Sequence, residues 1–172
     1  MPPPINTLEA VKLALRSATV TVVAADNGTT ASGGVDTSAA QTFPITVTAV
    51  NDAPVAAAST LTTIAEDVAD GSTPGALVSA LVTNFTDVDS GAVKGLAVTS
   101  VVTTNGTWYY STNAGSTWTT LTGVSTSAAR LLKGDDANYK VRFVPNANYN
   151  GTATLTYQAW DQTSGTAGAT AD

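Results

Sequence analysis

The side chains of this chain whose types and spacing suggest chemistry are carboxylates and amides. Asp87 and Asp89 lie two positions apart in the stretch FTDVDSG, and Asn51 and Asp52 lie in TVTAVNDAPV, between two strand-like runs. Where a strand gives way to a loop, the carboxylates of Asp87 and Asp89 can both turn toward one point. Such oxygen atoms are the ligands of calcium, which takes about six to eight of them in a flexible arrangement.

Further acidic residues extend this prediction to both ends of a sandwich. Asp161, which ends the strand-like run TLTYQAW, can reach the same pole as the FTDVDSG loop, with backbone carbonyls or water completing the set. Glu66 and Asp67 in TIAED are expected at the opposite pole. Each carboxylate can instead be a turn residue that accepts backbone amides, and that alternative stays open. The predicted calcium ligands are Asn51, Asp52, Asp87, Asp89, Asp161, Glu66 and Asp67.

The composition excludes several other functions. The chain of 172 residues has no Cys and no His, so thiol or imidazole nucleophiles, Cys/His zinc sites and disulfides are ruled out. With seven Lys and Arg and a formal charge of -6, it lacks a basic surface for nucleic acid. No apolar run has the length of a membrane span. The Thr-rich, Lys-poor and acidic composition is typical of large secreted bacterial repeat proteins.

Short alternating runs separated by turn signals predict an all-β sandwich. In NTLEAVKLALRS, Asn6 or Thr7 can cap a short helix. Pro44 removes a ladder donor and places its strand at an edge or a bulge. The strands are predicted at 18–26, 42–50, 55–64, 76–83, 93–102, 107–111, 117–121, 128–132, 139–144 and 152–159.

An internal repeat divides the chain. Residues 18–36 align without gaps on residues 153–171, and each copy has a strand followed by an Asp and a Gly-rich loop. The identical pairs include Ala18 and Ala153, Thr19 and Thr154, Thr21 and Thr156, Ala24 and Ala159, Asp26 and Asp161, and Gly33 and Gly168. The predicted organisation is a segment 1–17, two strands of one repeat in 18–50, and a sandwich 51–172 that lacks its final strand.

That missing strand predicts self-association. A sheet without its last strand exposes an unpaired edge. TFPITVTAV (42–50) is the type of strand that is lacking, so the hairpin 18–50 can fill the gap, either within one chain as a permuted sandwich or between two chains by strand exchange. A monomer with a frayed edge is the alternative.

Aromatic residues suggest a second function. Trp108, Tyr109, Tyr110 and Trp118 cluster in WYYSTNAGSTW, and an exposed row of rings would make the chain a carbohydrate-binding module. The alternation instead favours Trp108 and Tyr110 on one face, with Trp118 and Trp160 joining them in the core. Glycoside hydrolysis by paired carboxylates is disfavoured because Asp87 and Asp89 lie in a turn motif, so no enzyme activity is predicted.

Several stretches together resemble a known family. TVTAVNDAPV, TIAED, FTDVDSG and the region from GTWYYSTNAGSTW to NYNGTATLTYQAWDQTSG are similar to the cadherin-like tandem repeats of giant bacterial surface adhesins and type I secreted, RTX-like proteins. The resemblance implies an Ig-like or cadherin-like Greek-key sandwich at the cell surface, which binds calcium at repeat junctions. It also implies neighbouring repeats as partners, and a role as an extender in cell adhesion or biofilm formation.

Overall fold

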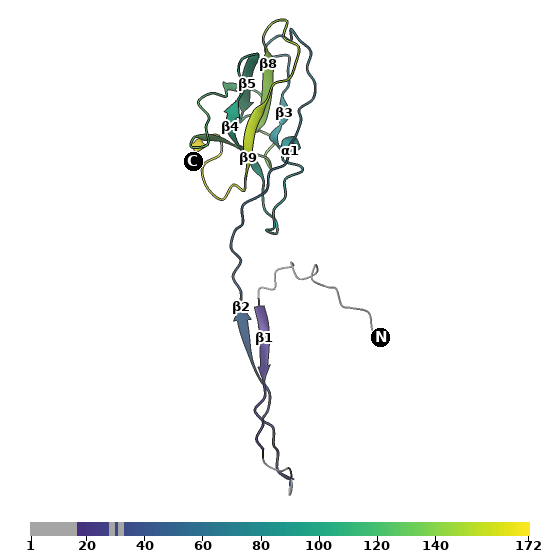
Figure 1. The fold of residues 1–172 in the computed structure, drawn as a ribbon, viewed down its shortest axis with the longest axis vertical. Coiled ribbons are helices and arrows are strands. Elements are labelled where there is room, and N and C mark those ends of the chain that lie inside the picture. The colour runs from purple at the N-terminus through teal and green to yellow at the C-terminus, as the bar shows by residue number, and fades with distance from the viewer. Residues whose placement is uncertain (1–16, 28–29, 31–32) are drawn as a thin grey trace, which may run out of the picture. The chain divides into compact units, whose positions relative to one another are not determined.

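The computed structural model describes residues 17–27, 30 and 33–172, which belong to two compact units (Figure 1). Unit 1 extends to Asn51 and unit 2 begins at Asp52, within one residue of the predicted boundary between 50 and 51. The predicted helix in residues 6–17 falls almost wholly outside the described residues. In the described part of the chain, no helix has the length and apolar character needed to cross a membrane.

Unit 1 is a β-hairpin. Strands β1 (Ser17–Val22) and β2 (Gln41–Thr46) pair antiparallel, with Val20 opposite Phe43 and Ala18 opposite Ile45. Beyond the ladder, Ala25 and Thr37 form a single bridge. Every residue of β2 is exposed, because a two-stranded sheet has no second layer to cover it. Pro44 is accommodated as predicted, since both strands of such a sheet are edges.

Unit 2 is the predicted all-β sandwich, built from two four-stranded sheets. The first sheet has the order β10, β7, β4, β9, and its strands are β4 (Gly95–Val101), β7 (Ala129–Lys133), β9 (Leu155–Trp160) and β10 (Thr170–Ala171). The second has the order β3, β8, β5, β6, and its strands are β3 (Ala76–Leu77), β5 (Gly106–Ser111), β6 (Thr119–Thr120) and β8 (Lys140–Pro145).

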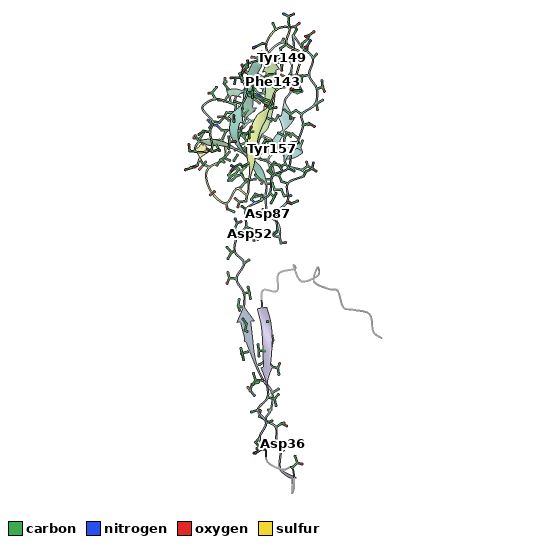
Figure 2. All side chains as sticks on the ribbon, viewed as in Figure 1. Asp36, Asp52, Asp87, Phe143, Tyr149 and Tyr157 are labelled. Carbon is green, nitrogen blue, oxygen red and sulfur yellow. The ribbon has the colours of Figure 1, made fainter. Side chains whose placement is uncertain are left out.

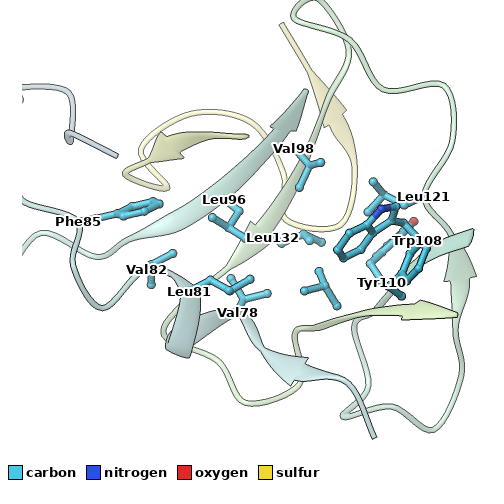
Figure 3. Packing of buried hydrophobic residues seen from close by; sticks show 12 residues of the cluster. Val78, Leu81, Val82, Phe85, Leu96, Val98, Trp108, Tyr110, Leu121 and Leu132 are labelled. Atoms are coloured by element: carbon cyan, nitrogen blue, oxygen red, sulfur yellow. The ribbon is translucent and has the colours of Figure 1, made fainter. Parts of the chain in front are cut away.

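The core lies between these sheets (Figure 3). Alternate residues of the strands point inward, as period-two strands require. Leu96 and Val98 of β4 and Leu132 of β7 face Trp108 of β5 and Val141 of β8. The ring centroids of Trp108 and Phe143 are 5.1 Å apart and tilted by 49°, an arrangement that aromatic pairs favour.

Two predicted strands differ in the structure. The strand expected at 76–83 pairs only at β3 and then turns into the helix α1 (Val78–Leu81). Val78, Leu81, Val82 and Phe85 have the spacing i, i+3, i+4, i+7, and all four are buried. A strand would point two of these four side chains away from the core, whereas a helical turn buries all four. The burial of apolar surface therefore favours the helix.

The strand expected at 55–64 forms no ladder. Val55 makes one antiparallel bridge with Thr86. Beyond it, burial still alternates, with Ala57, Ser59 and Leu61 half-buried between exposed neighbours. The segment therefore has the extended pattern that the sequence predicts, but not a neighbouring strand to pair with among the described residues.

The sandwich interior gives a direct stability prediction. Leu132→Ala is expected to lower the free energy of unfolding by about 2–5 kcal/mol, because Leu132 is fully buried and its loss leaves a cavity. Leu77→Ala is the matched control, since Leu77 is 37% exposed on the edge strand β3. Denaturant unfolding of both variants measures the difference. Equal losses would contradict the assignment of Leu132 to the core.

Candidate metal centre

One end of unit 2 collects the acidic residues of the FTDVDSG loop (Figure 2). Asp87 and Asp89 follow the buried Phe85, which fixes the start of the loop. The backbone N–H of Asp89 donates to Asp87 Oδ1 at 2.9 Å, and the backbone N–H of Asp52 donates to Asp89 Oδ2 at 2.7 Å. These two bonds join the first residue of unit 2 to the loop. Figure 2 shows Asp52 and Asp87 at the same end of the unit.

The second oxygen of Asp87 is the unusual atom of this loop. Asp87 Oδ2 is buried, and within the described residues nothing donates a hydrogen bond to it. A buried carboxylate oxygen without a partner costs free energy, so such atoms are rare unless water or an ion satisfies them. Asp87 therefore holds one oxygen in a backbone turn and leaves the other available to a cation.

Asp161 lies at the same end of the first sheet. It follows Trp160, the last residue of β9, which pairs with Gly95 at the start of β4, where the acidic loop arrives. Its Oδ1 accepts from the backbone N–H and the hydroxyl of Thr163 at 2.9 and 2.7 Å. The topology thus brings Asp161 to the predicted pole, where its side chain also forms a turn.

A positive charge belongs to the same region. Lys94 Nζ donates to the backbone carbonyl of Phe85 at 2.6 Å and is half-buried. Across residues 17–27, 30 and 33–172, no three acidic side chains lie close enough together to form a metal-binding group. A cation at Asp87 would therefore depend on backbone carbonyls and water for most of its ligands.

Asn51 and Asp52 divide between the two units. Asn51 closes unit 1 and Asp52 opens unit 2, where its backbone N–H rather than its carboxylate meets Asp89. The role of Asn51 as a ligand stays a prediction from the sequence.

Asp67 lies at the other end of unit 2. Its Oδ1 accepts from the backbone N–H of Asn148 at 2.7 Å, and Figure 2 shows the adjacent Tyr149 far from Asp52 and Asp87. Asp67 has φ 57°, a left-handed conformation that Asp and Asn tolerate better than most residues. Glu66 beside it is exposed. Asp67 therefore joins two loops at this end, a role that does not need a metal.

The aromatic residues are divided between the two faces of the second sheet. Trp108 and Tyr110 are in the core as predicted, with 4% and 8% of their surfaces exposed. Trp160 is buried as predicted, although it lies outside the cluster that contains Trp108, and its Nε1 donates to the carbonyl of Ser164 in the following loop at 2.8 Å. The prediction for Trp118 was wrong, since this residue is only half-buried and lies outside the core.

A buried arginine organises the outer face of this sheet, and the sequence reasoning missed it. The Arg142 guanidinium lies 4.4 Å from the Trp118 ring centroid and 5.0 Å from that of Tyr109, and its Nη2 is 2.6 Å from Asp70 Oδ1. Arg142 and Tyr109 are directly opposite each other on β8 and β5. The alternation of β5 predicts that Tyr109 lies on the outer face. That Arg142 lies next to it follows only from the pairing of β5 with β8, which the sequence does not show. Trp118 therefore packs on a guanidinium.

Comparisons of the chain with protein-family models, with curated proteins and with solved structures gave no match.

The loop contact of Asp67 gives one prediction. Asp67→Ala is expected to destabilise unit 2 by about 1–2 kcal/mol, because it removes the bond to Asn148 and strains a residue at positive φ. Asp67→Asn keeps an acceptor and tolerates the conformation, so it is expected to cost less. Thermal unfolding in chelator measures both, with Glu66→Ala as the exposed neighbour. Equal effects of the Ala and Asn variants would contradict this role.

The buried indoles give another prediction. Trp108 and Trp160 are 4% and 7% exposed, so the tryptophan emission of the folded chain is expected to be blue-shifted and weakly quenched by acrylamide. Soluble oligosaccharides are expected to leave that emission unchanged, because Trp108 and Tyr110 are in the core and Trp118 already packs on the Arg142 guanidinium. A red, fully quenchable emission would instead support the carbohydrate-binding function.

Proposed function

We propose that this chain is a calcium-stabilised, non-catalytic β-sandwich module of a bacterial surface or secreted adhesin. It would serve as an extender between the cell and an adhesive region, in cell adhesion or biofilm formation. Its partners would be calcium, neighbouring repeats of the same chain, and a second copy that exchanges a strand. The family resemblance of TVTAVNDAPV, TIAED and FTDVDSG supplies this role.

The observation that carries the calcium proposal is the buried Oδ2 of Asp87. It lacks a hydrogen-bond donor among the described residues, while Asp89 and Asp52 are held beside it by backbone bonds. Hard cations bind carboxylate and carbonyl oxygens, which are the groups that this loop offers. The chain also lacks Cys and His, so softer metals have fewer suitable ligands.

Lys94 limits how strongly this loop can bind a cation. Its ammonium group competes electrostatically with any divalent ion near Asp87, while its bond to the Phe85 carbonyl removes one oxygen from the candidate ligands. Asp161 Oδ1 is similarly engaged, because it accepts from the backbone N–H and the hydroxyl of Thr163. We therefore expect modest calcium affinity, of the kind found in extracellular modules that meet millimolar calcium.

A non-catalytic role is supported by how the paired carboxylates are used. Asp87 and Asp89 each accept a backbone N–H, so both are fixed as acceptors within a turn. A glycosidase needs its carboxylates on either side of a bound sugar ring, about 5 Å or more apart. Two residues that share one turn suit a cation better.

Calcium is expected to raise the melting temperature of unit 2 by several degrees relative to chelator. A ligand that binds only the native state at about 100 times its Kd stabilises that state by about 2.7 kcal/mol. Asp87→Asn should abolish the gain, because the amide keeps the turn bond to Asp89 but loses the charge. Differential scanning calorimetry with calcium and with chelator measures the shift.

The matched control is Asp136→Asn. Asp136 Oδ1 accepts from the backbone N–H of Asn138 at 2.9 Å, the same two-residue turn that Asp87 forms, but Asp136 is not one of the predicted ligands. This variant should retain the calcium response. Melting temperatures that are equal in calcium and chelator, or an Asp87→Asn variant that responds like the wild type, would refute calcium binding at this loop.

A further inference from the structure

The first sheet of unit 2 has an open edge at β9. The strand order β10, β7, β4, β9 leaves β9 with β4 as its one neighbour, so the backbone groups on its other side have no ladder partner in the described structure. Leu155, Tyr157 and Ala159 pack against the core but are only half-buried, whereas Trp160 at the end of the strand is buried. A six-residue edge of this kind is a template for a further strand.

A second segment without a ladder contacts a side chain of β9. The hydroxyl of Tyr157, which packs against the core, donates to the carbonyl of Ala57 at 2.8 Å. In the described residues, this is the one hydrogen bond that a backbone group of 56–64 makes. The segment 56–64 therefore forms no ladder with β9 and leaves the backbone edge of that strand unpaired.

Unit 1 contains a strand of the matching kind. The gapless alignment of residues 18–36 on 153–171 places β1 on β9, with Val20 on Leu155 and Ala18 on Ala153. In unit 1, β1 pairs with β2. In that pair, Val20 is opposite Phe43 and Ala18 is opposite Ile45. If β2 paired with β9 in the same register, Phe43 would lie opposite Leu155 and Ile45 opposite Ala153.

The side chains agree with this register. Directly opposite residues of an antiparallel pair point to the same face, and Leu155 and Ala153 pack against the core. Phe43 and Ile45 would therefore turn inward and cover the half-exposed edge of the core, whereas Thr42 and Thr46 would turn outward. In unit 1, Phe43 and Ile45 are 51% and 48% exposed, so they gain burial by the exchange.

Strand β2 of the same copy does not reach this register. With Ile45 opposite Ala153, β2 runs toward the Tyr149 end of unit 2, and Thr46 lies opposite Thr152. Asp52 is held by Asp89 at the other end (Figure 2). Six residue steps from Thr46 to Asp52 span at most about 21 Å. The eight steps from Thr152 to Trp160, of which β9 forms the last five, cover about 26 Å where the chain is extended, before any allowance for a turn.

We propose that the open edge of β9 binds strand β2 of a second copy of this chain, with Phe43 opposite Leu155. Two copies can exchange β2 reciprocally, which gives a closed symmetric dimer. The inference rests on the sheet edge and the internal repeat, and it is independent of calcium.

The first test is the molar mass of the full chain as a function of concentration, by sedimentation velocity in the presence of chelator. We expect a monomer–dimer equilibrium that Phe43→Lys shifts toward monomer by at least tenfold in dissociation constant. Thr42→Lys is the matched control, because it adds the same charge to the next residue of the same strand but on the outward face. It should leave the equilibrium close to that of the wild type.

The second test locates the contact by crosslinking. Since the chain has no cysteine, Phe43→Cys and Leu155→Cys variants can be mixed in equal amounts and oxidised without background. Peptide mass spectrometry should find a disulfide between positions 43 and 155 of different chains, and a lower yield when Thr42→Cys replaces Phe43→Cys.

Three outcomes would overturn the proposal. They are a monomeric mass up to the solubility limit, equal effects of Phe43→Lys and Thr42→Lys on the equilibrium, and a Phe43→Cys/Leu155→Cys double variant that crosslinks within single chains.

Discussion

The antiparallel pairing of β4 with both β7 and β9 is the interaction on which the rest of unit 2 depends. Gly95 at the start of β4 pairs with Lys133 on one side and with Trp160 on the other. These ladders set the register that turns Leu96, Val98 and Leu132 into the core. They also bring the loop that precedes β4 to the end of β9, so that the acidic loop and Asp161 meet at one end of the sandwich.

The position of β4 between β7 and β9 also explains why one end of the sandwich is rich in polar turns. Chain segments that leave or enter the first sheet at Gly95 and Trp160 must change direction there, and short Asp, Ser, Thr and Gly side chains stabilise such turns through local bonds to backbone amides. The bonds from Asp89, Asp52 and Thr163 to carboxylate oxygens are of this type. The proposed calcium would add to turns that already have these local hydrogen bonds.

The two sheets are completed to different degrees. In the second sheet, the Arg142 guanidinium on the outer face is enclosed by Tyr109 and Trp118 and paired with Asp70. In the first sheet, β9 has no ladder partner along its outer side in the described structure. The proposed strand exchange would pair this edge of β9.

What the sequence determined by itself was local. Period-two alternation and Gly, Asn and Asp turn signals predicted the two-layer β fold, most of its strands and the hairpin of unit 1. The alternation of WYY correctly placed Trp108 and Tyr110 in the core. The helical spacing of Val78, Leu81, Val82 and Phe85 is also present in the sequence, but a short run rich in apolar residues is equally compatible with a buried strand.

What only the tertiary structure decided was pairing across long distances. Residues 55–64 can form a strand only if another strand pairs with their backbone. The alternation of polar and apolar residues in the sequence does not show whether such a strand is present. The place of Trp118 depends on Arg142, which reaches it only because β8 pairs with β5 beside β6. Likewise, Asp67 and Asn148 are far apart in the sequence and meet through the fold. Side-chain periodicity is a property of one segment, whereas ladders, cation–π contacts and loop-to-loop hydrogen bonds need two segments whose meeting the whole fold determines.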